Sequence, residues 1–175
     1  MDRRIKKTKQ SLRKAFADLL SEKKIPRITV KELCDAADIT KSTFYSHYHD
    51  IYDFAGSIWK EFYDKIIEIS LCNVENPDYE SILTQIVEFL QKDESLYKTI
   101  MYTRKMLPYA TFSPEHDISE MLEEQVPGQP PIFYLYAVFI TSGVWGIMTR
   151  YPLEELTEEL LGELAEHLEN GFQRN

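Results

Sequence analysis

Apolar positions recur along this chain every three or four residues, which is the spacing of amphipathic α-helices. Residues 5–20 show the pattern first, with apolar side chains at Ile5, Leu12, Ala15, Phe16, Leu19 and Leu20. No segment has a convincing strand pattern. We therefore predict an all-α fold of about nine helices, at residues 5–20, 30–37, 41–48, 51–73, 79–92, 94–103, 114–124, 132–151 and 156–172.

The second and third expected helices are short and begin at hydroxyl residues. Thr29 and Glu32 have the spacing of a capping box, in which the threonine caps the helix and the glutamate reaches back. Asp38-Ile39 interrupts the apolar pattern, and Thr40 can cap the helix that follows. A short helix, a tight turn and a second short helix form a helix-turn-helix, whose second helix enters the major groove of DNA.

The outer side of that second helix carries small polar and hydrogen-bonding side chains. Serine and threonine fit close to base edges, and lysine donates to guanine or to phosphate. Tyrosine and histidine can donate to phosphate oxygens, which positions the helix without reading sequence. An ordinary helical hairpin is the alternative interpretation. We predict that DNA contacts come from Lys41, Ser42, Thr43, Tyr45, Ser46 and His47.

The charge is divided unevenly along the 175 residues, whose net charge is −9. Residues 1–49 contain 12 Lys and Arg against 6 Asp and Glu, whereas residues 50–175 contain 8 against 23. Cations that approach phosphates release counterions, so a basic end on an acidic protein favours a nucleic-acid surface there. A solvated basic helix face is the alternative.

Other features narrow the class of protein. The chain has no run of 18 apolar residues and no apolar segment after its basic start, so we expect neither a membrane span nor a signal peptide, and a cytoplasmic location. Cys34 and Cys72 are expected to be buried free thiols. The sequence contains no phosphate-binding glycine loop, nucleophile elbow or metal-spaced cluster, so we predict no enzyme activity, no cofactor and no metal site.

Residues 5–60 resemble the TetR family of bacterial transcriptional regulators. The resemblance rests on Ala15-Phe16, on residues 28–33 and 36–40, and above all on Ser42-Thr43-Phe44-Tyr45-Ser46-His47-Tyr48, followed by Asp50 and Phe54. It implies a DNA-binding domain at 1–49, with its motif at about 29–48, and a helical ligand-sensing and dimerisation domain at 50–175. It also implies a dimer on a palindromic DNA operator, most often a repressor, that a small effector releases.

The resemblance adds the caps Thr29 and Thr40 to the predicted DNA-binding residues. It fails at two positions. The turn usually has glycine where Asp38 stands, and the fourth helix usually opens with a phosphate-binding lysine where Ile51 stands. These departures leave open a helical interaction protein that has lost DNA binding, or a transfer of phosphate contacts to Lys6, Lys7, Lys9 or Lys24.

The last two expected helices, at about 132–151 and 156–172, are the predicted homodimer interface, because paired apolar helices from two subunits form a four-helix bundle. Gly143 and Gly146 are unusual inside a helix. Their small size suits a close helix crossing, either in the dimer or within one subunit. The aromatic residues between 59 and 136 either line an effector pocket or form core, so we predict no ligand-binding residue.

Overall fold

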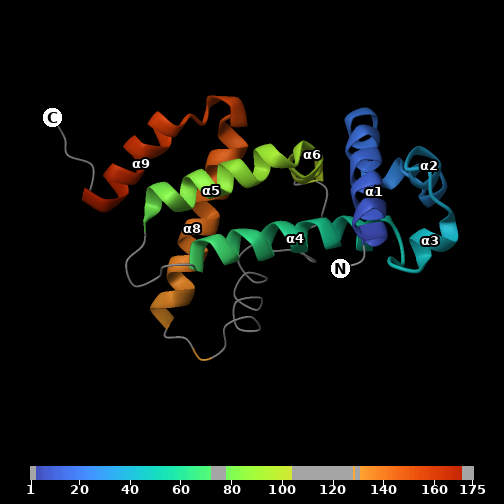
Figure 1. Cartoon of the computed structure of the whole chain (residues 1–175), viewed down its shortest axis with the longest axis horizontal. Helices are drawn as coiled ribbons and strands as arrows, with labels where there is room; N and C mark the ends of the chain where they lie inside the picture. Colours follow the sequence, from blue (N-terminus) through green and yellow to red (C-terminus); the bar gives the residue numbers. More distant parts are fainter. Residues whose placement is uncertain (1–2, 72–77, 104–127, 129–130, 171–175) are drawn as a thin grey trace. The chain divides into compact units, whose positions relative to one another are not determined.

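The computed structural model describes residues 3–71, 78–103, 128 and 131–170, and these residues form helices and connecting turns without a strand. Eight α-helices and two 3-10 helices lie in this part of the chain (Figure 1). They are α1 (Arg3–Glu22), η1 (Ile25–Arg27), α2 (Val30–Ala36), α3 (Lys41–Tyr45), α4 (Ile51–Leu71), α5 (Tyr79–Lys92), α6 (Glu94–Thr103), α8 (Pro131–Arg150), η2 (Leu153–Glu155) and α9 (Glu158–Asn170). The all-α prediction is confirmed; the helix expected at 114–124 and Cys72 lie outside the described residues.

Packing divides the chain into two compact units. The first comprises Met1–Phe62 and Asp93–Thr111, and the second comprises Tyr63–Lys92 and Phe112–Asn175. The helix α4 therefore contributes its first half to one unit and its second half to the other. The functional boundary after residue 49 stays a prediction.

Four aromatic rings form the centre of the first unit. Phe54 of α4 lies 5.3 Å from Phe16 of α1, 6.0 Å from Phe44 of α3 and 4.9 Å from Tyr48, measured between ring centroids. All four side chains are buried. Because edge-to-face rings of this size bury large apolar areas, this cluster fixes α3 against α1 and α4. Phe44 and Tyr48, four residues apart, both point into this core.

The helix α6 also belongs to the first unit. It packs closely along α1. The indole Nε1 of Trp59 in α4 donates to Thr103 Oγ1 at 2.9 Å, and this hydroxyl donates to the carbonyl oxygen of Thr99 at 2.7 Å. These buried groups join α6 to α4.

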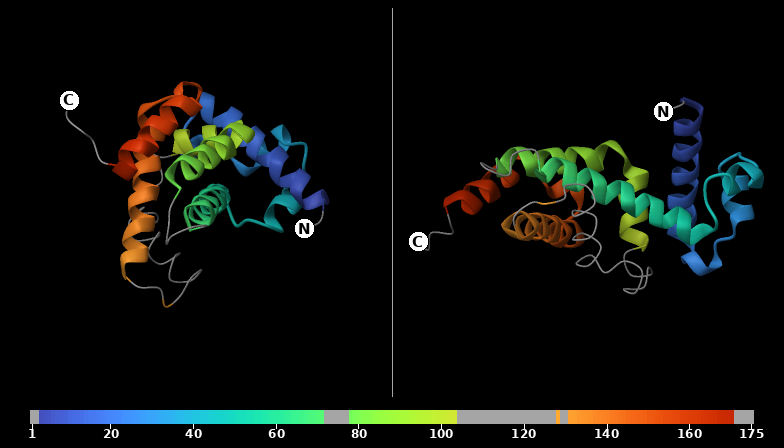
Figure 2. Two further views of the ribbon diagram at one scale, coloured as in Figure 1. Left: turned by 60° about the vertical axis from the view of Figure 1, so that its left-hand side comes forward. Right: turned by 90° about the horizontal axis from the view of Figure 1, so that it is seen from below.

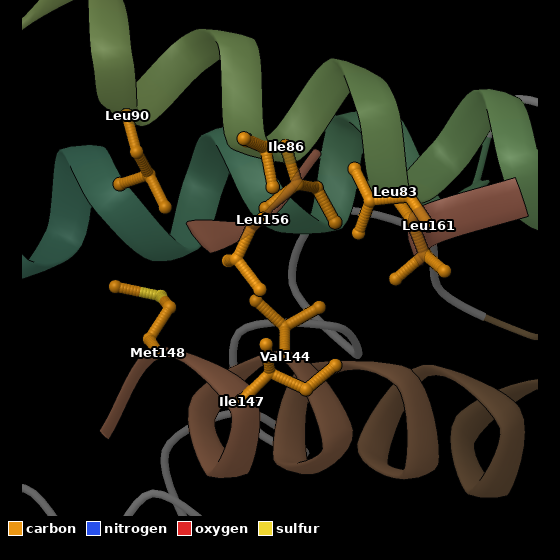
Figure 3. A pocket seen from close by; sticks show the side chains of 9 residues that line it. Leu83, Ile86, Leu90, Val144, Ile147, Met148, Leu156 and Leu161 are labelled. Carbon is orange, nitrogen blue, oxygen red and sulfur yellow. The ribbon is translucent and has the colours of Figure 1, made fainter. Parts of the chain in front are cut away.

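In the second unit α5 and α9 lie side by side, as both views of Figure 2 show. The side chains between α5, α8 and α9 form a partly open apolar hollow whose cavity space is about 10 Å³ (Figure 3). It is lined by Leu83, Ile86, Val87, Leu90, Val144, Ile147, Met148, Leu156 and Leu161. None of the helices in the described part of the chain is long and apolar enough to cross a membrane.

Several predicted helix bounds differ from the structure by one to three residues, and two of the differences have a visible physical reason. The helix that begins at Lys41 ends at Tyr45 rather than about Tyr48, because Ser46 and His47 turn the chain so that Tyr48 returns to the core. The last helix begins at Glu158 rather than Leu156. There the hydroxyl of Thr157 accepts from the backbone N–H of Leu160 at 3.3 Å and caps the helix.

Candidate nucleic-acid interface

The helix α2 begins at the capping box predicted for Thr29 and Glu32. The backbone N–H of Glu32 donates to Thr29 Oγ1 at 3.2 Å, and the backbone N–H of Thr29 donates to Glu32 Oε2 at 3.1 Å. Both groups would otherwise lack a partner at the start of a helix. The reciprocal bonds fix the direction in which the chain enters the helix-turn-helix.

The carboxylate of Glu32 also accepts from Lys23 Nζ, which lies 2.6 Å from Oε1. The hydrogen bond from Lys23, followed by those from Thr29, lowers the pKa of Glu32 from 4.5 to about 2. Lys23 is therefore occupied within the protein, and the capping box stays ionised well into the acid range.

The turn between α2 and α3 is built on Asp38, which has a φ of 54°. The backbone N–H of Ile39 donates to the Cys34 carbonyl at 3.0 Å, and that of Asp38 donates to the Asp35 carbonyl at 3.4 Å. This pair of bonds is a Schellman motif, which requires the left-handed conformation at the residue where glycine is most common. Aspartate tolerates this conformation better than most side chains do.

The helix α3 is capped by Thr40, whose Oγ1 accepts from the backbone N–H of Thr43 at 3.1 Å. The hydroxyls of Thr40 and Thr43 lie 2.9 Å apart, and Ser46 Oγ donates to the Thr43 carbonyl at 2.7 Å. Three of the predicted DNA-binding residues thus also hold the short helix in shape. Phe44 and Tyr48, which lie four residues apart, face the core on the opposite side of this segment.

The structure brings seven of the eight predicted DNA-binding residues together on α3 and its flanking turns, while Thr29 lies at the start of α2. Tyr45 is 56% exposed. Thr43 is half-buried, and the others are exposed: Thr29, Thr40, Lys41, Ser42, Ser46 and His47. Their contact with DNA stays a prediction.

Basic side chains near this surface fall into two groups. Arg13 is only 7% exposed and is held in ion pairs with Glu61 and Asp93, so it is not a solvated cation. Lys23 is paired with Glu32. The exposed cations of the first 49 residues in the described part of the chain are Lys6, Lys7, Lys14, Lys24, Arg27, Lys31 and Lys41.

The start of α4 is closed by carboxylates. Asp50 Oδ1 accepts from the backbone N–H of Asp53 at 2.8 Å, and Asp53 Oδ2 accepts from the backbone N–H of His49 at 2.7 Å. Ile51, which stands at the position where the resemblance implies lysine, is buried. These two negative charges repel phosphate, which the start of a helix otherwise attracts. The missing lysine is thus not replaced by the bare start of α4.

Comparison with known proteins finds a short match to a helix-turn-helix regulator. No family model matches the chain. Over 49 residues the chain is 41% identical to YxbF, an HTH-type transcriptional regulator of Bacillus subtilis (strain 168). The match covers 27% of this chain and 13% of that protein.

Solved structures match nearly the whole chain. A TetR/AcrR-family transcriptional regulator from Aquifex aeolicus VF5 covers 94% of this chain and 99% of its own, with a TM-score of 0.59 and 20% identity. The TetR-family regulator PfmR from Thermus thermophilus covers 94% and 96%, with a TM-score of 0.58 and 16% identity. DhaS, a dihydroxyacetone kinase operon activator, covers 95% and 98%, with a TM-score of 0.54 and 18% identity.

The fold is therefore that of helix-turn-helix regulators with a helical C-terminal part. More narrowly, the chain has the fold of the TetR/AcrR regulators, which is the fold that the resemblance of residues 5–60 implies.

Proposed function

We propose that this chain is a TetR-family transcriptional regulator that binds double-stranded DNA through residues 29–48. The observation that carries the proposal is the exposed polar surface of α3, presented by a helix whose opposite side is locked into an aromatic core. The 49-residue match to an HTH-type regulator supports it independently of the fold. A cytoplasmic location and the absence of enzyme activity follow from this function.

The DNA contacts divide into two kinds. Lys41, Ser42 and Thr43 lie in the first turn of α3, whose residues meet base edges in a helix-turn-helix. Tyr45 and His47 follow at the end of the segment and donate to phosphates, so they position the helix without reading sequence. Loss of a base contact changes the preferred sequence, whereas loss of a phosphate contact weakens binding to every sequence.

We further propose a homodimer that contacts its copy through α8 and α9. On α8, Leu135 is 65% exposed and Phe139 is 60% exposed, and Gly143 and Gly146 continue this side of the helix. The buried residues Ile140, Val144 and Met148 lie on the opposite side. Exposed large apolar side chains next to glycines suit a close helix crossing between two subunits.

The glycines allow a matched test of the dimer. Among the described residues, a Cβ at Gly143 or Gly146 meets no atom within 4 Å, so both positions accept side chains within one subunit. Gly146→Ala should keep the dimer, whereas Gly146→Leu and Phe139→Glu should yield folded monomers. Light scattering after gel filtration reports the mass, and circular dichroism verifies the helices. A Gly146→Leu protein that stays dimeric would place the interface elsewhere.

A small-molecule effector is proposed to bind in the second unit. The hollow among α5, α8 and α9 has an entirely apolar lining and suits an apolar group of a ligand (Figure 3). Its cavity space is only about 10 Å³, far below the roughly 300–1,000 Å³ typical of small-molecule sites. A ligand of that size therefore has to part α5 from α8. Most regulators of this type repress transcription, whereas DhaS is an activator. Expression of a reporter gene with and without the protein decides whether this protein represses or activates.

The rival function is a helical interaction protein without DNA binding. Asp38 in the turn and the carboxylates at the start of α4 favour it, since both place negative charge near the candidate interface. Selection of duplexes from a randomised pool separates the two functions. We expect enrichment of a palindrome, with affinity that falls steeply as salt rises. If no duplex is enriched at low salt without effector, the regulator hypothesis is wrong.

A further inference from the structure

Arg13 is a buried cation in the middle of α1. Its side chain is 9% exposed. Nη2 donates to Glu61 Oε2 of α4 at 2.6 Å, and Nη1 donates to Asp93 Oδ2, immediately before α6, at 2.6 Å. One side chain thus joins three segments of the first unit. We call Arg13, Glu61 and Asp93 the Arg13 latch.

Asp93 has two tasks within this latch. Its Oδ1 accepts from the backbone N–H of Leu96 at 3.0 Å and from Ser95 Oγ at 2.6 Å, so it caps α6. Its other oxygen, Oδ2, holds Arg13. The same carboxylate therefore fixes the start of α6 and ties it to α1, and the two helices cannot slide past each other while both sets of bonds persist.

A contribution to stability does not by itself account for the Arg13 latch. Burying a guanidinium costs several kcal/mol, and ion clusters of this kind are often no more stabilising than apolar residues of the same volume. Arg13 Nε has no hydrogen-bond partner in the described structure, and Glu61 is half-exposed. The cluster fixes the relative orientation of its helices better than apolar packing does, because a planar guanidinium holds two carboxylates in defined positions.

The latch connects to the recognition helix through one turn of α1. Phe16 lies three residues after Arg13, on the same side of the helix, and its ring contacts Phe54 at 5.3 Å. Phe54 in turn contacts Phe44 of α3 at 6.0 Å. A rotation of α1 at Arg13 therefore moves the ring against which α3 packs.

We propose that Arg13 is a positioning residue for DNA binding. The latch holds α1 on α4 and on the first turn of α6, so that α6 and the helix-turn-helix move as one body. The inference rests on the proposed function, and it assigns an influence on DNA affinity to Asp93, which is remote in sequence from residues 29–48.

Asp93→Ser is the decisive variant, because serine keeps the cap of α6 but is too short to reach Arg13. Arg13→Met removes the latch from the other side while keeping the bulk of the side chain. Glu94→Gln is the matched control: it breaks an exposed ion pair with Lys98 in the same turn of α6 and leaves the three residues of the Arg13 latch unchanged. Affinity is measured by fluorescence anisotropy on a duplex selected with the wild-type protein, at a temperature where circular dichroism shows every variant folded.

We expect Asp93→Ser and Arg13→Met each to weaken binding at least about fivefold, the lower end of typical coupling between sites. The double variant should bind no worse than the weaker single variant, and Glu94→Gln should bind like the wild type. If the variants unfold more easily but bind with wild-type affinity, or if their effects multiply in the double variant, the positioning role is refuted while DNA binding stands. If the wild-type protein selects no duplex, both proposals fail together.

Discussion

The aspartate in the turn of the helix-turn-helix makes a quantitative prediction possible. Asp38 has a φ of 54° and lies where the Schellman motif of α2 demands a left-handed residue. An ordinary side chain costs roughly 1–2 kcal/mol in this conformation, glycine costs almost nothing, and asparagine and aspartate lie between them. The stabilities should therefore rank Gly above Asp and Asn, with Ala lowest.

We expect Asp38→Ala to lower the free energy of unfolding by about 1 kcal/mol and Asp38→Gly to raise it by a few tenths. For a chain of this length, about 1 kcal/mol moves the Tm by roughly 2–4 °C. Thermal denaturation followed by circular dichroism measures the series. An alanine variant as stable as the glycine variant would mean that the turn relaxes and that the left-handed conformation is not imposed by the motif.

The Asp38 variants also separate the effect of the turn conformation from the effect of the Asp38 charge on DNA binding. A carboxylate about 10 Å from a phosphate repels it by roughly 0.4 kcal/mol in water, which is about twofold in affinity. Asp38→Asn removes that charge and keeps the turn, so it should bind DNA about twofold more tightly at low salt and show a smaller gain at high salt. Unchanged affinity at low salt would place the Asp38 carboxylate well away from the phosphates.

Four further predictions follow from the site. Glu32→Gln should destabilise the protein at neutral pH; because the pKa of Glu32 is lowered in the folded state, this difference should persist above pH 4.5 and vanish as the pH falls to about 2, in denaturation curves recorded across that range. Thr40→Ala should lower the free energy of unfolding by about 1 kcal/mol, because α3 loses its cap. Lys41→Ala should leave the Tm unchanged and weaken DNA binding. Equal losses of Tm in the two variants would contradict these separate roles. Phe54→Ala should cost roughly 3–5 kcal/mol in urea denaturation, against less than about 0.5 kcal/mol for the exposed Tyr52→Ala. Tyr45→Ala should weaken binding to all duplexes alike, and a changed sequence preference in repeated selection would assign it a base contact instead.

Local sequence signals are sufficient to predict most of the helix-turn-helix. Thr29 and Glu32, Asp38, and Thr40 act over three to five residues, and the structure has the cap or turn predicted at each. The inward placement of Phe44 follows from the same short-range periodicity. The predicted start of α9 is wrong although a local signal exists, because Leu156 continues the apolar spacing while Thr157 supplies the cap.

The Arg13 latch has no comparable local signal. Its partners are 48 and 80 residues away along the chain, and an arginine among lysines on an amphipathic helix looks like a solvated cation. Only the packing of α6 along α1 reveals that the side chain is buried. The spacing of Gly143 and Gly146 likewise allows either an internal crossing or a dimer, and in the described structure both glycines are exposed.

The hydrogen bonds of α3 have a consequence for how such a protein can diverge. Thr40, Thr43 and Ser46 use their hydroxyls to hold the helix, and Phe44 and Tyr48 anchor it in the core, so substitution at these positions threatens the fold. Lys41, Ser42, Tyr45 and His47 are exposed, and surface changes usually alter stability by no more than about 0.5 kcal/mol. After a gene duplication, a copy of this protein can therefore acquire a new target sequence through Lys41 and Ser42, and a new affinity through Tyr45 and His47, while its scaffold stays intact.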